Sequence, residues 1–134
     1  MDVKSLYTVI PHAEGLKALK HFLDLRSNQS PPTHTLVCLA ELVLTLNHFQ
    51  FDNEFFTQTN GVSIGTKMRP SYACLFLGYI ENQFFAQYRG PQPETFLRYI
   101  DDCVGTTIMP RHDLESYIEA FEDAHPTIEF TFDI

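Results

Sequence analysis

Basic residues are scarce in this sequence. Nine Lys and Arg stand against 17 Asp and Glu among 134 residues, so the formal net charge at pH 7 is −8. Because proteins bind the phosphate backbone of nucleic acids mainly through Lys and Arg, this chain by itself is expected to bind nucleic acid weakly.

Signals for export or for crossing a membrane are also missing. The start of the chain, Met1 to Lys4, lacks a basic segment followed by an apolar one. The longest apolar run, Leu36 to Leu46, is interrupted by Glu41 and has about half of the roughly 20 residues that a membrane span requires. Three cysteines show no metal-ligand spacing and are interpreted as reduced thiols: Cys38, Cys74 and Cys103. We therefore expect an intracellular protein of the nucleus or cytoplasm, neither secreted nor bound to a membrane.

The residues that are present are sufficient for a folded core. Hydrophobic residues make up 44% of the chain and include twelve Phe and six Tyr. A chain of this length suits one compact domain. Because no internal repeat, low-complexity tract or domain boundary is visible, we predict a single folded domain over residues 1–134.

Hydrophobic periodicity predicts an α+β domain in which helices pack on an antiparallel sheet. The expected elements are, in order, a strand near 2–6, helices over 14–26 and 33–49, a hairpin over 49–58, a helix over 70–87, a hairpin over 95–108, a helix from 110 and a strand over 127–134. The segment 33–49 is apolar nearly all round, and such a helix is expected in the interior. In this arrangement an acid of the first strand and the acids of the second hairpin can meet.

The second predicted hairpin carries two adjacent acids, Asp101 and Asp102, between apolar stretches, and we expect both at its tip. One interpretation is an ordinary turn, because Asp tolerates turn conformations. The other is a metal site, because adjacent carboxylates repel and a divalent cation neutralises them. Their hard oxygen ligands suit Mg²⁺ or Mn²⁺, and two such ions about 4 Å apart can catalyse nucleotidyl transfer. That chemistry requires a further carboxylate from another strand, for which Asp2 is the candidate.

Three segments in this order resemble the palm motifs of reverse transcriptases. Residues 2–7, DVKSLY, resemble the first motif, residues 61–73, GVSIGTKMRPSYA, the second, and residues 99–102, YIDD, the third. The flanking sequences are most similar to those of Penelope-like retroelements, and the likeness covers essentially the whole chain. An unrelated acidic α+β domain with a fortuitous pair of aspartates is the alternative that the three ordered motifs disfavour.

The resemblance implies an RNA-directed DNA polymerase that adds deoxynucleotides to a primer 3′-hydroxyl. It implies that Asp2 and Asp101 bind two Mg²⁺ ions, for which Mn²⁺ could substitute, and that Asp102 supports the site. Tyr7 would lie under the incoming sugar and reject a ribose 2′-hydroxyl, although a half-buried core aromatic is the plainer interpretation. Gly65 would allow close approach of the template strand, and Lys67 would reach a phosphate. The implied partners are an RNA or DNA template with its primer, and a deoxynucleoside triphosphate.

The sequence also departs from the family pattern. It begins at the first motif and ends just before the expected primer grip, so residues 1–134 correspond to a partial reverse transcriptase domain, a palm truncated at fingers and thumb. Arg69 stands where a small residue is expected, and it could either crowd the template path or contact a phosphate. We therefore expect this isolated chain to be inactive. The alternative function is that of a non-enzymatic retroelement remnant that acts as a protein-interaction module.

Overall fold

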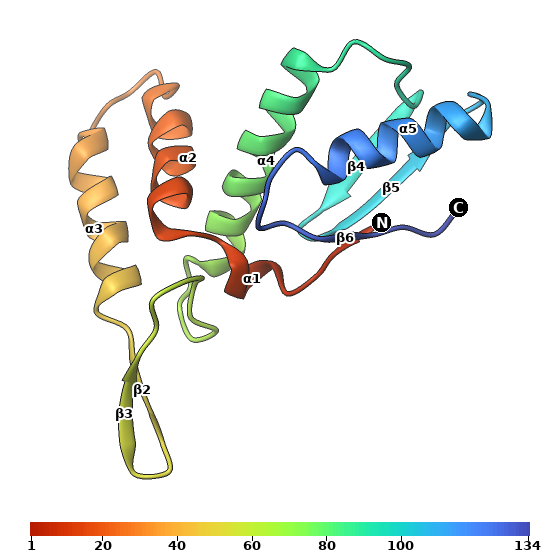
Figure 1. The fold of residues 1–134 in the computed structure, drawn as a ribbon. Coiled ribbons are helices and arrows are strands. Elements are labelled where there is room, and N and C mark those ends of the chain that lie inside the picture. Colours follow the sequence, from red (N-terminus) through yellow and green to blue (C-terminus); the bar gives the residue numbers. More distant parts are fainter. The chain divides into compact units, whose positions relative to one another are not determined.

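The computed structural model describes all residues from Met1 to Ile134, which form two compact units. Unit 1 comprises Met1–Leu6 and Ile80–Ile134, and unit 2 comprises Tyr7–Tyr79. The elements shown in Figure 1 are β1 (Asp2–Val3), α1 (Leu6–Val9), α2 (His12–Asp24), α3 (Thr33–Thr45), β2 (His48–Phe51), β3 (Glu54–Thr57), α4 (Arg69–Gln87), β4 (Thr95–Tyr99), β5 (Asp102–Thr106), α5 (Arg111–Glu122) and β6 (Phe130–Thr131). Mixed helices and antiparallel strands confirm the predicted α+β class.

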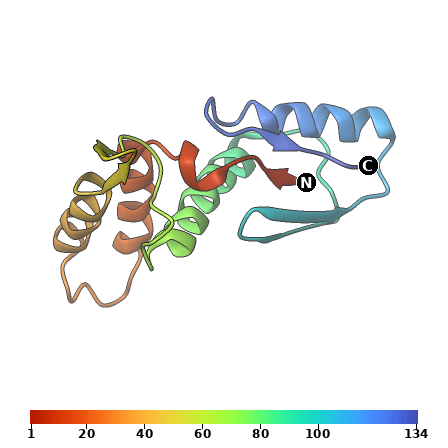
Figure 2. The same cartoon turned by 90° about the horizontal axis from the view of Figure 1, so that it is seen from below.

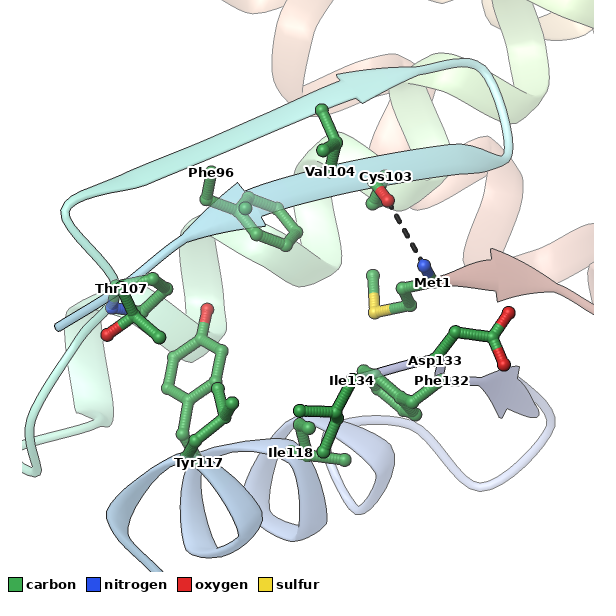
Figure 3. A pocket seen from close by; sticks show the side chains of 13 residues that line it. Met1, Phe96, Cys103, Val104, Thr107, Tyr117, Ile118, Phe132, Asp133 and Ile134 are labelled. Atoms are coloured by element: carbon green, nitrogen blue, oxygen red, sulfur yellow. Dashed lines mark hydrogen bonds between the residues drawn. The ribbon is translucent and has the colours of Figure 1, made fainter. Parts of the chain in front are cut away.

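The strands of unit 1 meet although they lie far apart in the sequence. β1 pairs with β6 in antiparallel register, with Asp2 opposite Thr131, and β4 pairs with β5 as a hairpin. The backbones of Met1 and Cys103 exchange two hydrogen bonds, of 3.1 and 2.8 Å, and one of them is drawn in Figure 3. These bonds place β1 beside β5, so the two-stranded sheet β1–β6 lies next to the two-stranded sheet β4–β5 in unit 1 (Figure 2).

Aromatic rings fill the core of unit 1. The buried Phe121 of α5 contacts the rings of Phe84, Phe96 and Phe130, with centroid separations of 4.8, 5.6 and 5.0 Å. α4, β4, α5 and β6 therefore converge on one side chain. The helix predicted over 70–87 is confirmed, and the four apolar residues expected on one stripe are all buried: Ala73, Leu77, Ile80 and Phe84.

Tyr117 brings a polar group into this core. Its side chain is 3% exposed, and its buried hydroxyl has no hydrogen-bond partner. Burial raises the pKa of this phenol to about 12. A buried hydroxyl without a partner costs roughly 1–3 kcal/mol relative to its hydration in the unfolded chain.

Tyr117→Phe is therefore expected to stabilise the chain by about 1 kcal/mol, measured as a higher midpoint of urea unfolding at neutral pH. In the parent chain the unfolded phenol ionises from about pH 10 and the folded phenol only near pH 12. Folding therefore loses stability as pH rises through this window, and the variant lacks this contribution. Destabilisation by Tyr117→Phe at neutral pH would mean that the hydroxyl has a favourable partner.

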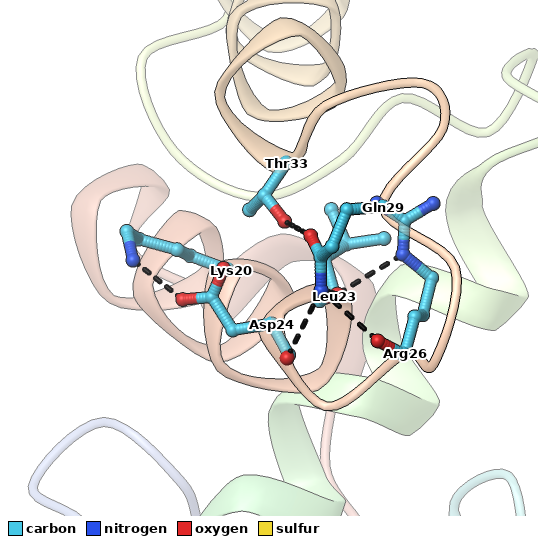
Figure 4. Close-up of polar contacts among 6 residues, drawn as sticks. All are labelled: Lys20, Leu23, Asp24, Arg26, Gln29 and Thr33. Atoms are coloured by element: carbon cyan, nitrogen blue, oxygen red, sulfur yellow. Dashed lines mark hydrogen bonds and ion pairs between the residues drawn. The ribbon is translucent and has the colours of Figure 1, made fainter.

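In unit 2, α2 and α3 lie side by side, and the turn between them is held by the Gln29 side chain (Figures 1 and 4). Its amide nitrogen donates to the carbonyl oxygens of Leu23, Asp24 and Arg26 at 3.1–3.3 Å, which satisfies the last turn of α2. Its amide oxygen accepts from the Thr33 hydroxyl at the start of α3, at 2.8 Å. One side chain therefore joins the end of α2 to the beginning of α3. The pKa of Asp24 is lowered, chiefly by a hydrogen bond from Lys20.

The prediction that α3 lies in the interior is wrong. Only Thr33, Ala40 and Leu44 are buried, and the side of α3 turned away from α2 stays exposed because no other element of unit 2 covers it. The two terminal strands are also shorter than predicted. Each has two residues, because the pairing between β1 and β6 extends over only two residues and Leu6 already begins α1.

None of the helices is both long and apolar enough to cross a membrane.

Candidate carboxylate site in unit 1

The hairpin β4–β5 turns through two residues, Ile100 and Asp101. Ile100 is the first of the two central residues of a type II′ turn. Its backbone φ is +58°, a conformation that usually requires glycine. Asp102 is not in the turn, because it pairs with Tyr99 as the first residue of β5. The expectation that both acids occupy the tip is therefore wrong by one residue. The loop that joins the two strands has only two residues, so Asp102 already belongs to the paired part of β5.

Ile100 is strained in this conformation, because a β-branched side chain at positive φ is a genuine outlier. Such strain costs on the order of 1–3 kcal/mol and persists only where the surroundings enforce it. Arg98 provides one restraint, since its Nη1 donates to the Ile100 carbonyl oxygen at 3.0 Å. Its Nε and Nη2 donate to both carboxylate oxygens of Glu81 in α4, at 2.6 and 3.0 Å. The turn is thereby anchored to a helix.

Sequence reasoning missed Glu81 and Arg98. Both side chains are about 85% buried, since their exposed fractions are 16% and 15%. A signal was present in β4, where Arg98 shares the inward face of the strand with Phe96. A charged residue at an inward position indicates a buried ionic partner.

Asp2 and Asp102 face each other across two strands. The mutual backbone bonds between Met1 and Cys103 define a hydrogen-bonded antiparallel pair. By this pattern the next residues along each strand, Asp2 and Asp102, are opposite each other with their side chains on the same face. Both are exposed, and neither takes part in a salt bridge. Residues separated by a hundred positions thus share one patch of sheet.

The carboxylate oxygens of Asp2 and Asp102 are ligands that suit a divalent cation. Like charges directly opposite on a sheet destabilise it, and a hard cation such as Mg²⁺ removes that repulsion through carboxylate oxygens. Asp101 lies next to the pair in the turn and is half-buried. No three side chains of His, Cys, Asp or Glu are grouped closely enough to hold a metal ion. In the structure Asp2 lies opposite Asp102, whereas the resemblance to reverse transcriptases implied that Asp2 and Asp101 bind the metal ions together.

The opposite face of β5 lines a pocket. Its volume is about 370 Å³, and its walls come from β4, β5, α5 and the segment after β6 (Figure 3). Phe96, Ile118 and Phe132 make it largely apolar. Cys103 also lines it, and burial raises the pKa of this thiol to about 11. Asp102 does not line this pocket, so its carboxylate lies outside it.

The other three predicted site residues belong to unit 2. Tyr7 lies in α1 and is half-buried, and the Arg69 guanidinium stands over its ring at 4.4 Å from the centroid. Gly65 and Lys67 are exposed in the loop that leads into α4. A Cβ atom at Gly65 would meet nothing closer than the Ser63 hydroxyl oxygen at 4.0 Å. Glycine is therefore not required at position 65 by the folded chain itself.

Gly61, which the sequence did not place among the site residues, is the glycine that the fold requires. Its φ is +73°, and an added Cβ would lie 2.5 Å from the Tyr7 carbonyl oxygen and 2.6 Å from the Thr8 Cα. Its N–H donates to the Ile10 carbonyl at 2.9 Å, and its own carbonyl is 2.8 Å from Nε2 of His12. The loop is thereby fastened to α1 and to the start of α2. Only a residue without a side chain fits this contact.

No protein-family model, curated protein or solved structure matches the chain.

Proposed function

We propose that this chain is the palm portion of a reverse transcriptase, with Asp2, Asp101 and Asp102 as its metal-binding carboxylates. The observation that carries the proposal is the pairing of Asp2 with Asp102 beside a strained turn. Two acids from strands a hundred residues apart lie on one exposed face, and a buried ion pair restrains the turn that precedes Asp102. Strain that the surroundings enforce is typical of functional sites.

Each residue has a role that follows from its position. Asp2 and Asp102 would supply carboxylate oxygens from adjacent strands, and Asp101, which is not grouped with them, is proposed as a further ligand from the turn. Arg98 and Glu81 are positioning residues, because they hold the Ile100 carbonyl and so the turn that carries Asp101. When bound, two Mg²⁺ or Mn²⁺ ions would activate a primer hydroxyl and stabilise the leaving phosphate oxygen. In unit 2, Tyr7 is the proposed sugar-contacting residue, and Gly65 and Lys67 border the proposed template path.

We expect the isolated chain to bind metal without extending a primer. Template, primer and deoxynucleoside triphosphate must be held in position for phosphoryl transfer, and a chain with a net charge of −8 binds nucleic acid weakly. Catalysis therefore belongs to a longer enzyme that contributes basic residues.

The proposal predicts a Mn²⁺ site that depends on these acids. Titration of the chain with Mn²⁺, followed by electron paramagnetic resonance of the free ion, is expected to reveal binding that weakens at least about tenfold in Asp2→Asn, Asp101→Asn and Asp102→Asn. Asp52→Asn is the matched control, because Asp52 is also an exposed hairpin-turn acid but has no acidic neighbour across a strand. Its affinity is expected to equal that of the parent chain.

Two outcomes would contradict this picture. Equal Mn²⁺ binding by the parent chain and Asp102→Asn would show that these carboxylates do not bind the metal ion. Primer extension on a poly-rA template by the parent chain, absent from the Asp101→Asn, Asp102→Asn double variant, would instead refute the expected inactivity of the isolated chain.

A second candidate function is that of a protein-interaction module. It is favoured by a separate observation, the amount of apolar surface that unit 2 leaves exposed.

A further inference from the structure

Exposed apolar side chains of unit 2 are concentrated in α3 and the hairpin β2–β3. Eight of the fifteen large hydrophobic residues that are exposed in the chain lie between positions 39 and 56. They define what we name the α3–hairpin surface: Leu39, Leu42, Val43, Leu46, Phe49, Phe51, Phe55 and Phe56. The first three lie along one side of α3 and Leu46 follows at its C-terminal end, whereas the last four belong to the projecting hairpin (Figure 1).

The hairpin gathers most of its exposed phenylalanine surface on one face. Phe49, Phe51 and Phe56 share that face and are between 40% and 69% exposed, whereas Phe55 lies on the other face, opposite Gln50. With about 200 Å² for a whole Phe side chain, the exposed parts of these three amount to roughly 300 Å². The largest apolar patch of a typical monomer is about 300–600 Å² and is often functional. Such an area indicates a binding surface.

The hairpin also offers unpaired backbone groups. Asp52 and Asn53, at φ +50° and +62°, form a type I′ turn, so Phe51 and Glu54 are the first hydrogen-bonded pair. Hydrogen-bonded pairs alternate with non-hydrogen-bonded pairs along an antiparallel ladder. In the non-hydrogen-bonded pairs, the backbone N–H and C=O groups point away from the partner strand. The outward residues are His48 and Gln50 on β2 and Phe55 and Thr57 on β3. No third strand pairs with either edge.

The charge of the segment that contains α3 and the hairpin indicates what kind of partner it attracts. The 40 residues from 27 to 66 contain no Lys or Arg, and Glu41, Asp52 and Glu54 are their only charged residues apart from histidine. This charge repels the phosphates of nucleic acid. It also opposes a second copy of the same hairpin, because Asp52 and Glu54 would face the same two acids. A basic partner is favoured.

We propose that the α3–hairpin surface binds a basic polypeptide segment that adds to the hairpin as a third strand. The partner carries apolar residues that cover the exposed phenylalanines, and Lys or Arg residues that approach Asp52 and Glu54. Main-chain hydrogen bonds along the free edge supply affinity, and the alternating side chains supply specificity. Isolated two-stranded hairpins are marginally stable, so the third strand also orders β2–β3.

The test uses three labelled peptides and the complete 134-residue chain. The first peptide alternates Val and Lys, the second alternates Val and Glu, and the third is the first with proline at two inner positions. Binding is followed by fluorescence anisotropy at about 0.15 M salt. The first peptide is expected to bind, and the other two at least about tenfold more weakly.

Variants of the chain locate the site. Phe51→Ser, Phe55→Ser is expected to weaken binding of the Val–Lys peptide about tenfold or more. Ile108→Ser is the matched control, because Ile108 is 91% exposed but lies in unit 1, and its affinity is expected to be unchanged. Gln50→Pro and Thr57→Pro each remove an outward N–H from one edge. One of them is expected to abolish binding, which identifies the edge that is used.

Several results would overturn the proposal. They are equal binding of the Val–Lys and Val–Glu peptides, unchanged binding in Phe51→Ser, Phe55→Ser, or unchanged binding in both proline variants. A dimer of the parent chain that Phe51→Ser, Phe55→Ser dissociates in sedimentation would assign the surface to a second copy instead. Mn²⁺ affinity of the double serine variant remains that of the parent chain, because the carboxylate pair lies in unit 1. Failure here therefore leaves the proposed metal site unaffected.

Discussion

Gly61→Ala is expected to destabilise unit 2 by about 3 kcal/mol. Alanine pays roughly 1–2 kcal/mol for the left-handed conformation at φ +73°. Its Cβ would also overlap the Tyr7 carbonyl oxygen and the Thr8 Cα at 2.5 and 2.6 Å, and relief of such an overlap costs about 1–3 kcal/mol. Both contacts are with backbone, which cannot turn aside as a flexible side chain can. Urea unfolding followed by circular dichroism measures the loss as a lower midpoint.

The same loop contains the control for this substitution. Gly65 has no positive φ, and a Cβ there would enter open space. Gly65→Ala is therefore expected to change stability by no more than about 0.5 kcal/mol. Equal losses in the two variants would show that the loop tolerates neither side chain for some reason other than the contact with α1.

Glu81→Ala is expected to destabilise unit 1 by about 3 kcal/mol. It leaves the Arg98 guanidinium, which is only 15% exposed, without the carboxylate that accepts two of its hydrogen bonds. Removing one partner of a buried ion pair typically costs about 3–5 kcal/mol, and the remaining solvent contact places this pair at the lower end. Thermal or urea unfolding measures the change in free energy.

A double variant separates the buried charge from the packing. Glu81→Leu, Arg98→Met replaces both charges by apolar side chains of similar size, and it is expected to recover most of the lost stability. Its Mn²⁺ affinity is nevertheless expected to fall, because the Ile100 carbonyl loses the bond that restrains the turn. A double variant as unstable as Glu81→Ala would assign the loss to the packing volume of the pair instead.

The sequence predicted elements whose signals are local. The Asp52–Asn53 pair indicated the first hairpin, and the structure confirms it, because Asp and Asn tolerate the positive φ that a type I′ turn requires. Pro70 and the apolar spacing after it indicated α4. The three ordered motifs carry the likeness to reverse transcriptases, which stays a prediction.

The tertiary structure alone decided how these elements meet. The apolar pattern of α3 predicted burial, but burial depends on whether other elements cover the helix, and in unit 2 only α2 covers one side of it. The pairing of Asp2 with Asp102 depends on the register between β1 and β5, and a shift by one residue would turn one side chain to the other face. The need for glycine at position 61 rather than 65 arises from the approach of α1, since periodicity and turn chemistry carry no information about contacts between distant segments.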